Sequence, residues 1–278
     1  SIAVKYLTVV HDDMLIIDRS GSMTTNDKIG AAKNAARLYA DATADGNMLG
    51  LVSFSGDNTE PNEDATLEHS LSVVNSTIRQ DIKDAINSLV ASGMTSIGDG
   101  LWTGLQELET SGDPGHPCAM VLLGDGMENE ARYWDYSGHP SVKTDIVDSA
   151  CVVDTIALGP TTNEALLQEI ANLTGGTYHY VPDENPSALA RGVNQTFGDW
   201  RNELAGTYEF VQGDVAGRSR LFEINGETST AVGPVTHTMT LEEDLTEAIF
   251  FVNFAYSSRD YIRLYDPTGH LVTEKDDD

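Results

Sequence analysis

The chain has 278 residues, of which 40% are hydrophobic, so it is long enough to bury a substantial core in one large domain or two smaller ones. Its 16 basic and 44 acidic residues give a net charge of −28, which argues against nucleic acid as a partner because phosphate contacts need clustered Lys and Arg. No apolar run approaches the roughly 18 residues that span a bilayer, so we expect no membrane insertion by this chain.

Apolar strands and amphipathic helices alternate along the first two thirds of the chain. The first strand is the apolar run that begins at Met14 and ends at Asp18. The elements that follow are expected in this order: helix 27–43, strand 47–56, strand 65–74, helix 77–92, helix 96–112, strand 118–126, helix 142–150, strand 151–159, helix 163–176, strand 176–181 and helix 186–204. Such alternation predicts an α/β fold with a doubly wound, mainly parallel sheet flanked by helices.

The character of the sequence changes near Gly206. Short β-rich runs follow, separated by Gly, Asn, Asp and Pro: "GTYEFVQG", "SRLFEIN", "VTHTMTL", "AIFFVNFAYS" and "YIRLYDPTGHLV". They predict a second, smaller, antiparallel β domain, so the expected domains are 1–205 and 206–278.

The two cysteines, Cys118 and Cys151, each stand at the start of an apolar run. There is no C-x-x-C motif, so a zinc cluster or a redox pair of that kind is not expected. If the two strands are adjacent and parallel, the sulfurs lie near each other. A disulfide and two buried free thiols both remain open.

Oxygen-bearing side chains gather at the ends of two expected strands. Asp18 ends the first strand and is followed by Ser20 and Ser22 at alternate positions, and Asp125 ends the strand "AMVLLGD". Thr95 lies in the Gly-rich loop "SGMTSIGDG" before a helix. Doubly wound sheets bind ligands at the carboxyl ends of their strands. Two carboxylates and three hydroxyls form an all-oxygen set that suits Mg²⁺, or Mn²⁺ or Ca²⁺, better than zinc or copper.

These residues also have structural interpretations. Asp and Ser are favoured helix caps, so Asp18 and Ser20 can cap the helix that follows, and Thr95 can cap the helix after its loop. Asp99 is typical of an acid in the first turn of a helix. The seven histidines are scattered and form no H-x-x-x-H pair.

The motif "DRSGSM", followed by Thr95 and by the "GDG" that contains Asp125, resembles the metal-ion-dependent adhesion site of von Willebrand factor A domains. The pattern D-x-S-x-S, a loop Thr and an Asp at a strand end occurs in the same order over residues 10–205. The stretch "TIALGP…LQEIANLTGGTYHYV" resembles in particular the domain of calcium-activated chloride channel regulators and related prokaryotic surface proteins. The resemblance implies that five residues bind the ion directly or through water: Asp18, Ser20, Ser22, Thr95 and Asp125. Gly124 stands where the family commonly has Thr or Ser.

The resemblance implies a binding module without catalysis. Mg²⁺ keeps near-octahedral geometry, so five protein ligands leave a position that a carboxylate of a partner protein can fill. The expected location is extracellular or at the cell surface, within a larger multidomain protein, with a cytoplasmic location as the alternative.

Two other functions are alternatives to a binding module. An intracellular assembly subunit, as in chelatase-type complexes that dock ATPase rings, agrees less well with the expected β domain. A metal-dependent phosphohydrolase would also place an Asp at the end of the first strand. However, Ser20 stands where such enzymes have a second Asp, and neither Ser20 nor Ser22 lies in G-x-S-x-G.

Overall fold

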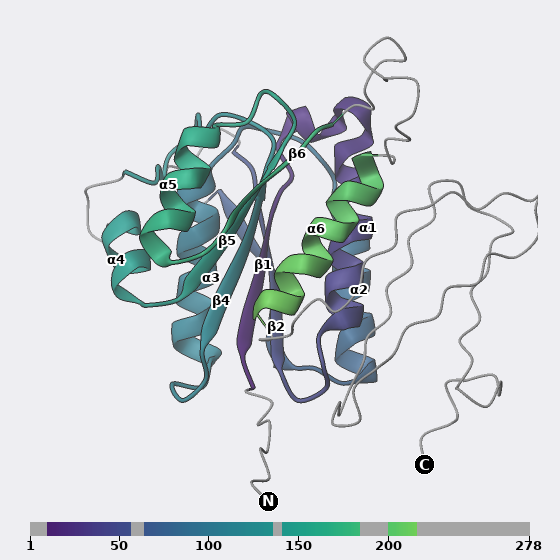
Figure 1. The fold of residues 1–278 in the computed structure, drawn as a ribbon, viewed down its shortest axis with the longest axis vertical. Helices are drawn as coiled ribbons and strands as arrows, with labels where there is room; N and C mark the ends of the chain where they lie inside the picture. Colours follow the sequence, from purple (N-terminus) through teal and green to yellow (C-terminus); the bar gives the residue numbers. More distant parts are fainter. Residues whose placement is uncertain (1–9, 57–63, 136–140, 184–199, 216–278) are drawn as a thin grey trace, which may run out of the picture.

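The computed structural model describes residues 10–56, 64–135, 141–183 and 200–215 (Figure 1). The described residues form a sheet of six strands in the order β3-β2-β1-β4-β5-β6. The strands are β1 (Asp12–Asp18), β2 (Met48–Phe54), β3 (Ala65–Val73), β4 (Cys118–Gly124), β5 (Val152–Leu158) and β6 (Tyr178–Val181). Neighbouring strands are parallel except β2 and β3, which are antiparallel. The chain leaves β1 to build one side of the sheet and returns to β4 on the other side, so the strand order reverses between β1 and β4.

Helices cover both faces of the sheet, as Figure 1 shows. They are the 3₁₀ helix η1 (Gly21–Asp27), α1 (Lys28–Ala42), α2 (Ser76–Ser88), α3 (Ile97–Ser111), α4 (Val142–Asp148), α5 (Glu164–Thr174) and α6 (Trp200–Val215). Buried residues of α1, α2 and α6 share one core cluster, and those of α3, α4 and α5 share the other. Among the described helices, none is both long enough and apolar enough to cross a membrane.

The central strand β1 is buried along its whole length. Leu15 and Ile17 point into the core under α1, whereas Met14 and Ile16 point into the core under α3. A strand that is covered on both faces reads as a continuous apolar run, because side chains of both orientations are removed from water. The predicted doubly wound α/β fold is therefore confirmed for the part of the chain that the structure describes.

The end of the described chain differs from the expectation. The run "GTYEFVQG", expected as a strand, belongs to α6 and is helical to Val215. Leu204, Ala205, Tyr208 and Val211 are buried at helical spacing, and the ring of Tyr208 meets that of Tyr39 edge-on at 6.4 Å between centroids. The part of the expected helix at 186–199 and the other expected strands of 206–278 lie outside the described residues.

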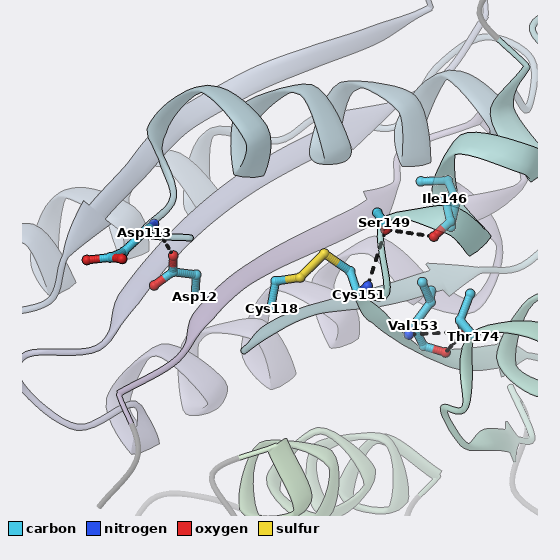
Figure 2. The surroundings of a disulfide bond; sticks show 8 residues. All are labelled: Asp12, Asp113, Cys118, Ile146, Ser149, Cys151, Val153 and Thr174. Carbon is cyan, nitrogen blue, oxygen red and sulfur yellow. Dashed lines mark hydrogen bonds between the residues drawn. A yellow bond between two sulfur atoms is a disulfide. The ribbon is translucent and has the colours of Figure 1, made fainter. Parts of the chain in front are cut away.

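The two cysteines form a disulfide, so of the two alternatives the free thiols are wrong. Cys118 begins β4, and Cys151 directly precedes β5, the neighbouring parallel strand (Figure 2). The amide of Cys151 donates to the hydroxyl of Ser149 at 3.2 Å. Because β4 starts at Cys118 and ends at Gly124, the disulfide and Asp125 lie at opposite ends of the same strand.

Candidate metal centre

The carboxyl ends of β1 and β4 bring Asp18 and Asp125 together. The two strands are parallel neighbours with Ile17 opposite Leu123, so the residues that follow reach the same edge of the sheet. The backbone amide of Asp125 donates to Oδ2 of Asp18 at 3.3 Å. Both side chains are completely buried. The geometry therefore places two carboxylates side by side at the point where the strand order reverses.

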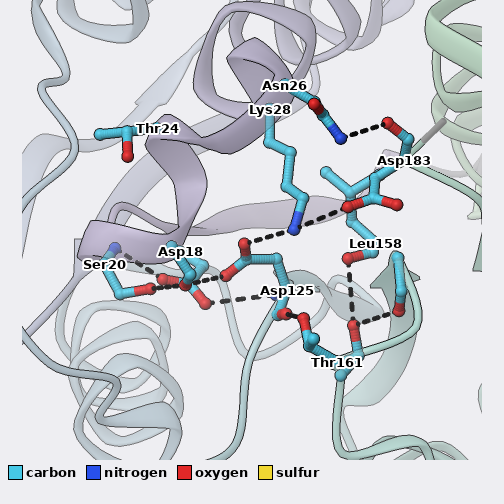
Figure 3. Close-up of polar contacts among 12 residues, drawn as sticks. Asp18, Ser20, Thr24, Asn26, Lys28, Asp125, Leu158, Thr161 and Asp183 are labelled. Carbon is cyan, nitrogen blue, oxygen red and sulfur yellow. Dashed lines mark hydrogen bonds and ion pairs between the residues drawn. The ribbon is translucent and has the colours of Figure 1, made fainter.

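The two serines turn back toward this pair. The amide of Ser20 donates to Oδ1 of Asp18 at 2.7 Å, which folds the chain over the end of β1 (Figure 3). The hydroxyls of Ser20 and Ser22 lie 3.0 Å apart, and that of Ser22 donates to Oδ1 of Asp125 at 2.6 Å. The 3₁₀ helix η1 follows directly and has Ser20 at its N-cap position, but the Ser20 side chain makes no capping hydrogen bond. Ser22 is exposed, so the group of oxygens reaches the surface at this residue.

Thr95 completes the group from the loop before α3. Its backbone amide donates to the side chain of Asn129 at 2.9 Å, and its carbonyl accepts from the amide of Asn129 at 3.0 Å. A Cβ atom on Gly126 would lie 3.4 Å from Oγ1 of Thr95 and 3.6 Å from Oγ of Ser22, so both hydroxyls face this glycine. The cap position of α3 belongs to Ser96, and Asp99 is a first-turn acid as expected. The structure thus brings the five predicted residues to one place.

The electrostatics of the paired carboxylates favour a cation. Burial raises the pKa of Asp18 to about 7, and the charge of Asp125 adds to this rise, although hydrogen bonds from Ser20 and Asp125 oppose it. Two carboxylates and three hydroxyl oxygens fit a hard divalent ion. Among the described residues, no three His, Cys, Asp or Glu side chains gather in a group that could hold a metal. The candidate site therefore depends on hydroxyl ligands as well as on carboxylates.

Lys28, which is not among the five predicted residues, contacts the second carboxylate oxygen of Asp125. It is the first residue of α1 and is only 3% exposed. Its Nζ lies 3.0 Å from Oδ2 of Asp125 and 3.0 Å from Oδ2 of Asp183 (Figure 3). Burial lowers the pKa of Lys28, but the hydrogen bonds and charges of Asp125 and Asp183 outweigh burial and raise it, so the group is an ammonium. A lysine in the first turn of a helix is unfavourable for the helix dipole, and this is the sequence signal that points to a special contact.

Left-handed backbone at two residues directs Lys28 inward. Asn26 and Asp27 have φ of 53° and 58°, which is uncommon outside glycine and bends the chain between η1 and α1. The side-chain amide of Asn26 donates to the carbonyl of Asp183 at 3.2 Å. Asp183 in turn packs against Gly159, where a Cβ would lie only 2.6 Å from its Cγ. Asp183, one of the two carboxylates that pair with Lys28, is therefore itself held in place by Asn26 and by its packing on Gly159.

Comparison with known proteins agrees with this fold. Residues 14–128 match the model of the von Willebrand factor type A domain. Calcium-activated chloride channel regulator 4 of Homo sapiens is 26% identical over 265 residues, which cover 93% of this chain but 25% of that protein. The chain thus spans about a quarter of the length of this relative.

Solved structures share the fold at lower identity. A von Willebrand factor type A protein from Catenulispora acidiphila superposes with a TM-score of 0.57 at 22% identity, covering 75% of this chain and 43% of that one. Proximal thread matrix protein 1 from the mussel byssus, solved with zinc in its MIDAS motif, gives a TM-score of 0.50 at 20% identity over 72% of this chain and 46% of that one.

Proposed function

Because the chain contains a von Willebrand factor type A domain, we propose that it is a metal-dependent protein-binding module. In this proposal a divalent ion is held by the five residues of the candidate centre: Asp18, Ser20, Ser22, Thr95 and Asp125. A carboxylate of a partner protein completes the coordination, so the ion bridges the two proteins.

One observation carries the proposal: two fully buried carboxylates lie next to each other, and hydroxyls surround them. Like charges in this arrangement repel, and a cation between them removes the repulsion. Five oxygen donors leave one position of an octahedron for an outside ligand, and the exposure of Ser22 gives that ligand a route from solvent. We propose Mg²⁺ as the ion, with Mn²⁺ and Ca²⁺ as alternatives, because the donors are hard oxygens. The zinc seen in the mussel protein supports a divalent ion at the related motif of that protein.

Charge and covalent chemistry support the proposed partner and the proposed location. A chain with a net charge of −28 repels an acidic partner on average, so a bound cation would favour attachment through a carboxylate at the candidate centre. The disulfide between Cys118 and Cys151 is typical of proteins in oxidising compartments, which supports an extracellular or cell-surface location. We also propose that the chain is part of a larger multidomain protein, because it matches only 25% of the length of the chloride channel regulator.

Thermal unfolding of the full chain in Mg²⁺ and in EDTA tests the metal site. Because an ion that binds only the folded site stabilises it by mass action, we expect Mg²⁺ at about 100 times its Kd to add about 2.7 kcal/mol. The double change Asp18→Ala with Asp125→Ala should abolish this gain. The control is Asp81→Ala with Asp84→Ala, which removes two exposed carboxylates of α2. A gain that persists in the first double variant would contradict the proposed site.

Two further measurements test the binding function itself. Surface proteins should bind to the immobilised chain in Mg²⁺ and be released by EDTA, and the Asp18→Ala, Asp125→Ala variant should capture none of them. Hydrolysis of a generic phosphate ester that disappears in Asp18→Asn would instead show an enzyme and contradict a pure binding role.

A further inference from the structure

Each oxygen of the two carboxylates in the candidate centre already has a protein partner. Oδ1 and Oδ2 of Asp18 accept from the backbone amides of Ser20 and Asp125 at 2.7 and 3.3 Å. Oδ1 of Asp125 accepts from the hydroxyl of Ser22 at 2.6 Å, and Oδ2 of Asp125 accepts from Nζ of Lys28 at 3.0 Å (Figure 3). These partners differ in how readily they can give way to a metal ion.

The Ser22 hydroxyl can give way, whereas the Lys28 ammonium cannot. A hydroxyl that rotates about its C–O bond frees Oδ1 of Asp125 and turns its own lone pairs to the ion. The ammonium is 3% exposed and also pairs with Asp183 at 3.0 Å, so withdrawing it would leave a buried charge poorly compensated. Asp125 therefore offers one oxygen to an ion and keeps the other on Lys28.

We propose that Lys28 is a specificity-determining residue of the centre: it holds Oδ2 of Asp125 and so favours six-coordinate Mg²⁺ or Mn²⁺ over Ca²⁺. Ca²⁺ takes six to eight oxygens and often binds a carboxylate through both of them, whereas Mg²⁺ requires near-octahedral geometry. Five residues that give one oxygen each, with one outside ligand, provide six. The inference rests on the proposed metal-binding function.

The surroundings of Lys28 fix it in this role. Asp183, its second anchor, is 8% exposed and packs against Gly159, which has no side chain to displace it. Asn26, two residues before Lys28, donates to the carbonyl of the same Asp183 at 3.2 Å. On the other side, Thr161 donates to the carbonyl of Asp125 at 2.9 Å. The Lys28–Asp125 pair is thus held from three segments of the chain.

Calorimetric titration of the full chain with MgCl₂, MnCl₂ and CaCl₂ tests the proposal through the ratio of Kd for Ca²⁺ to Kd for Mg²⁺. Removing a positive charge strengthens binding of all divalent ions alike, so the ratio isolates the coordination. We expect the wild-type protein to prefer Mg²⁺ and Lys28→Met to lower the ratio by about tenfold, the scale of groups that orient metal ligands. Lys28→Arg, which keeps a cation on Asp125, should retain the preference. Lys83→Met is the control, since it removes the same charge from the Lys83–Asp41 pair on the surface.

The outcomes separate this inference from the function on which it rests. A wild-type chain that binds no divalent ion would contradict the proposed function. A wild-type chain that binds Ca²⁺ as tightly as Mg²⁺, or an unchanged ratio in folded Lys28→Met, would overturn only the role of Lys28. If Lys28→Met does not fold, the same ratio is measured in the double variant Lys28→Met with Asp183→Asn. This variant removes the cation together with one of its two carboxylate partners, so it leaves less uncompensated buried charge. An unchanged ratio in that variant would equally overturn the role.

Discussion

Replacing Asp18 with Asn tests whether the metal-free centre contains electrostatic strain that a cation relieves. The pKa of Asp18 lies at about 7 in the folded protein against 3.8 for the free group. The folded pKa is raised, so the stability contributed by neutral Asp18 is complete below pH 4 and is lost as the pH rises to 7. About three pH units at 1.36 kcal/mol each give a loss on the order of 4 kcal/mol at pH 8.

Asn removes the charge but also changes one hydrogen bond. Its carbonyl can still accept from the amide of Ser20, whereas its NH₂ group faces the amide of Asp125 where Oδ2 accepted at 3.3 Å. An unsatisfied amide costs about 1–3 kcal/mol, so we expect Asp18→Asn to stabilise the metal-free protein at pH 8 by about 2 kcal/mol. In a chain of this size that raises Tm by roughly 5 °C.

The assay is thermal and urea unfolding of both proteins in EDTA from pH 4.5 to 8.5. Wild type should lose stability as the pH rises from 4.5 to about 7 and then level off, whereas Asp18→Asn should show a flatter profile and no gain from Mg²⁺. Asp81→Asn, which removes an exposed carboxylate on α2, should follow the wild-type profile. If Asp18→Asn is less stable than wild type at pH 8, or keeps its pH slope, burial beside Asp125 does not strain Asp18.

Two further predictions concern the scaffold. Cys118→Ser with Cys151→Ser should lower the free energy of unfolding by about 4 kcal/mol, because the disulfide closes a sequence separation of 33 residues; an equal urea midpoint for both proteins would contradict this. Asn75→Ala should lower the free energy of unfolding by about 1 kcal/mol, since the Asn75 side chain accepts from the amides of Thr77 and Ile78 at the start of α2. Asn75→Asp keeps the cap, so in the same urea titration it should be as stable as the wild-type protein.

The main elements of the fold could be predicted because burial leaves a pattern. β1 and β4 read as unbroken apolar runs since helices cover both faces, and α2 shows an amphipathic stripe that includes Ile82 and Ile86. Parallel strands end at the same edge of a sheet, so the sequence predicts Asp18 and Asp125 at one edge, and the pairing of β1 with β4 in the structure makes them neighbours. The sequence does not decide between a disulfide and free thiols, because it does not fix which strands are neighbours.

The errors have identifiable physical causes. The residues of α6 after Ala205 include Gly206, Thr207, Tyr208 and Phe210, which favour turns and strands, so local propensity pointed away from a helix. Packing of Tyr208 and Val211 in the core with α1 residues decides in favour of the helix. Lys28 was missed because its burial depends on left-handed backbone at Asn26 and Asp27, which no periodic pattern reveals.

The placement of the candidate centre on the central strand has a mechanical consequence. The chain enters β1 at Asp12 and reaches the centre at Asp18, and β2 and β4 pair with β1 on its two sides. A pull between a ligand at the centre and the chain before Asp12 acts along β1, so the hydrogen bonds on both sides share the load and must fail together. An edge strand under a sideways pull would instead lose its bonds one at a time. Resistance of this kind depends on the unfolding rate, so attachment through the candidate centre should be measured as a lifetime under tension.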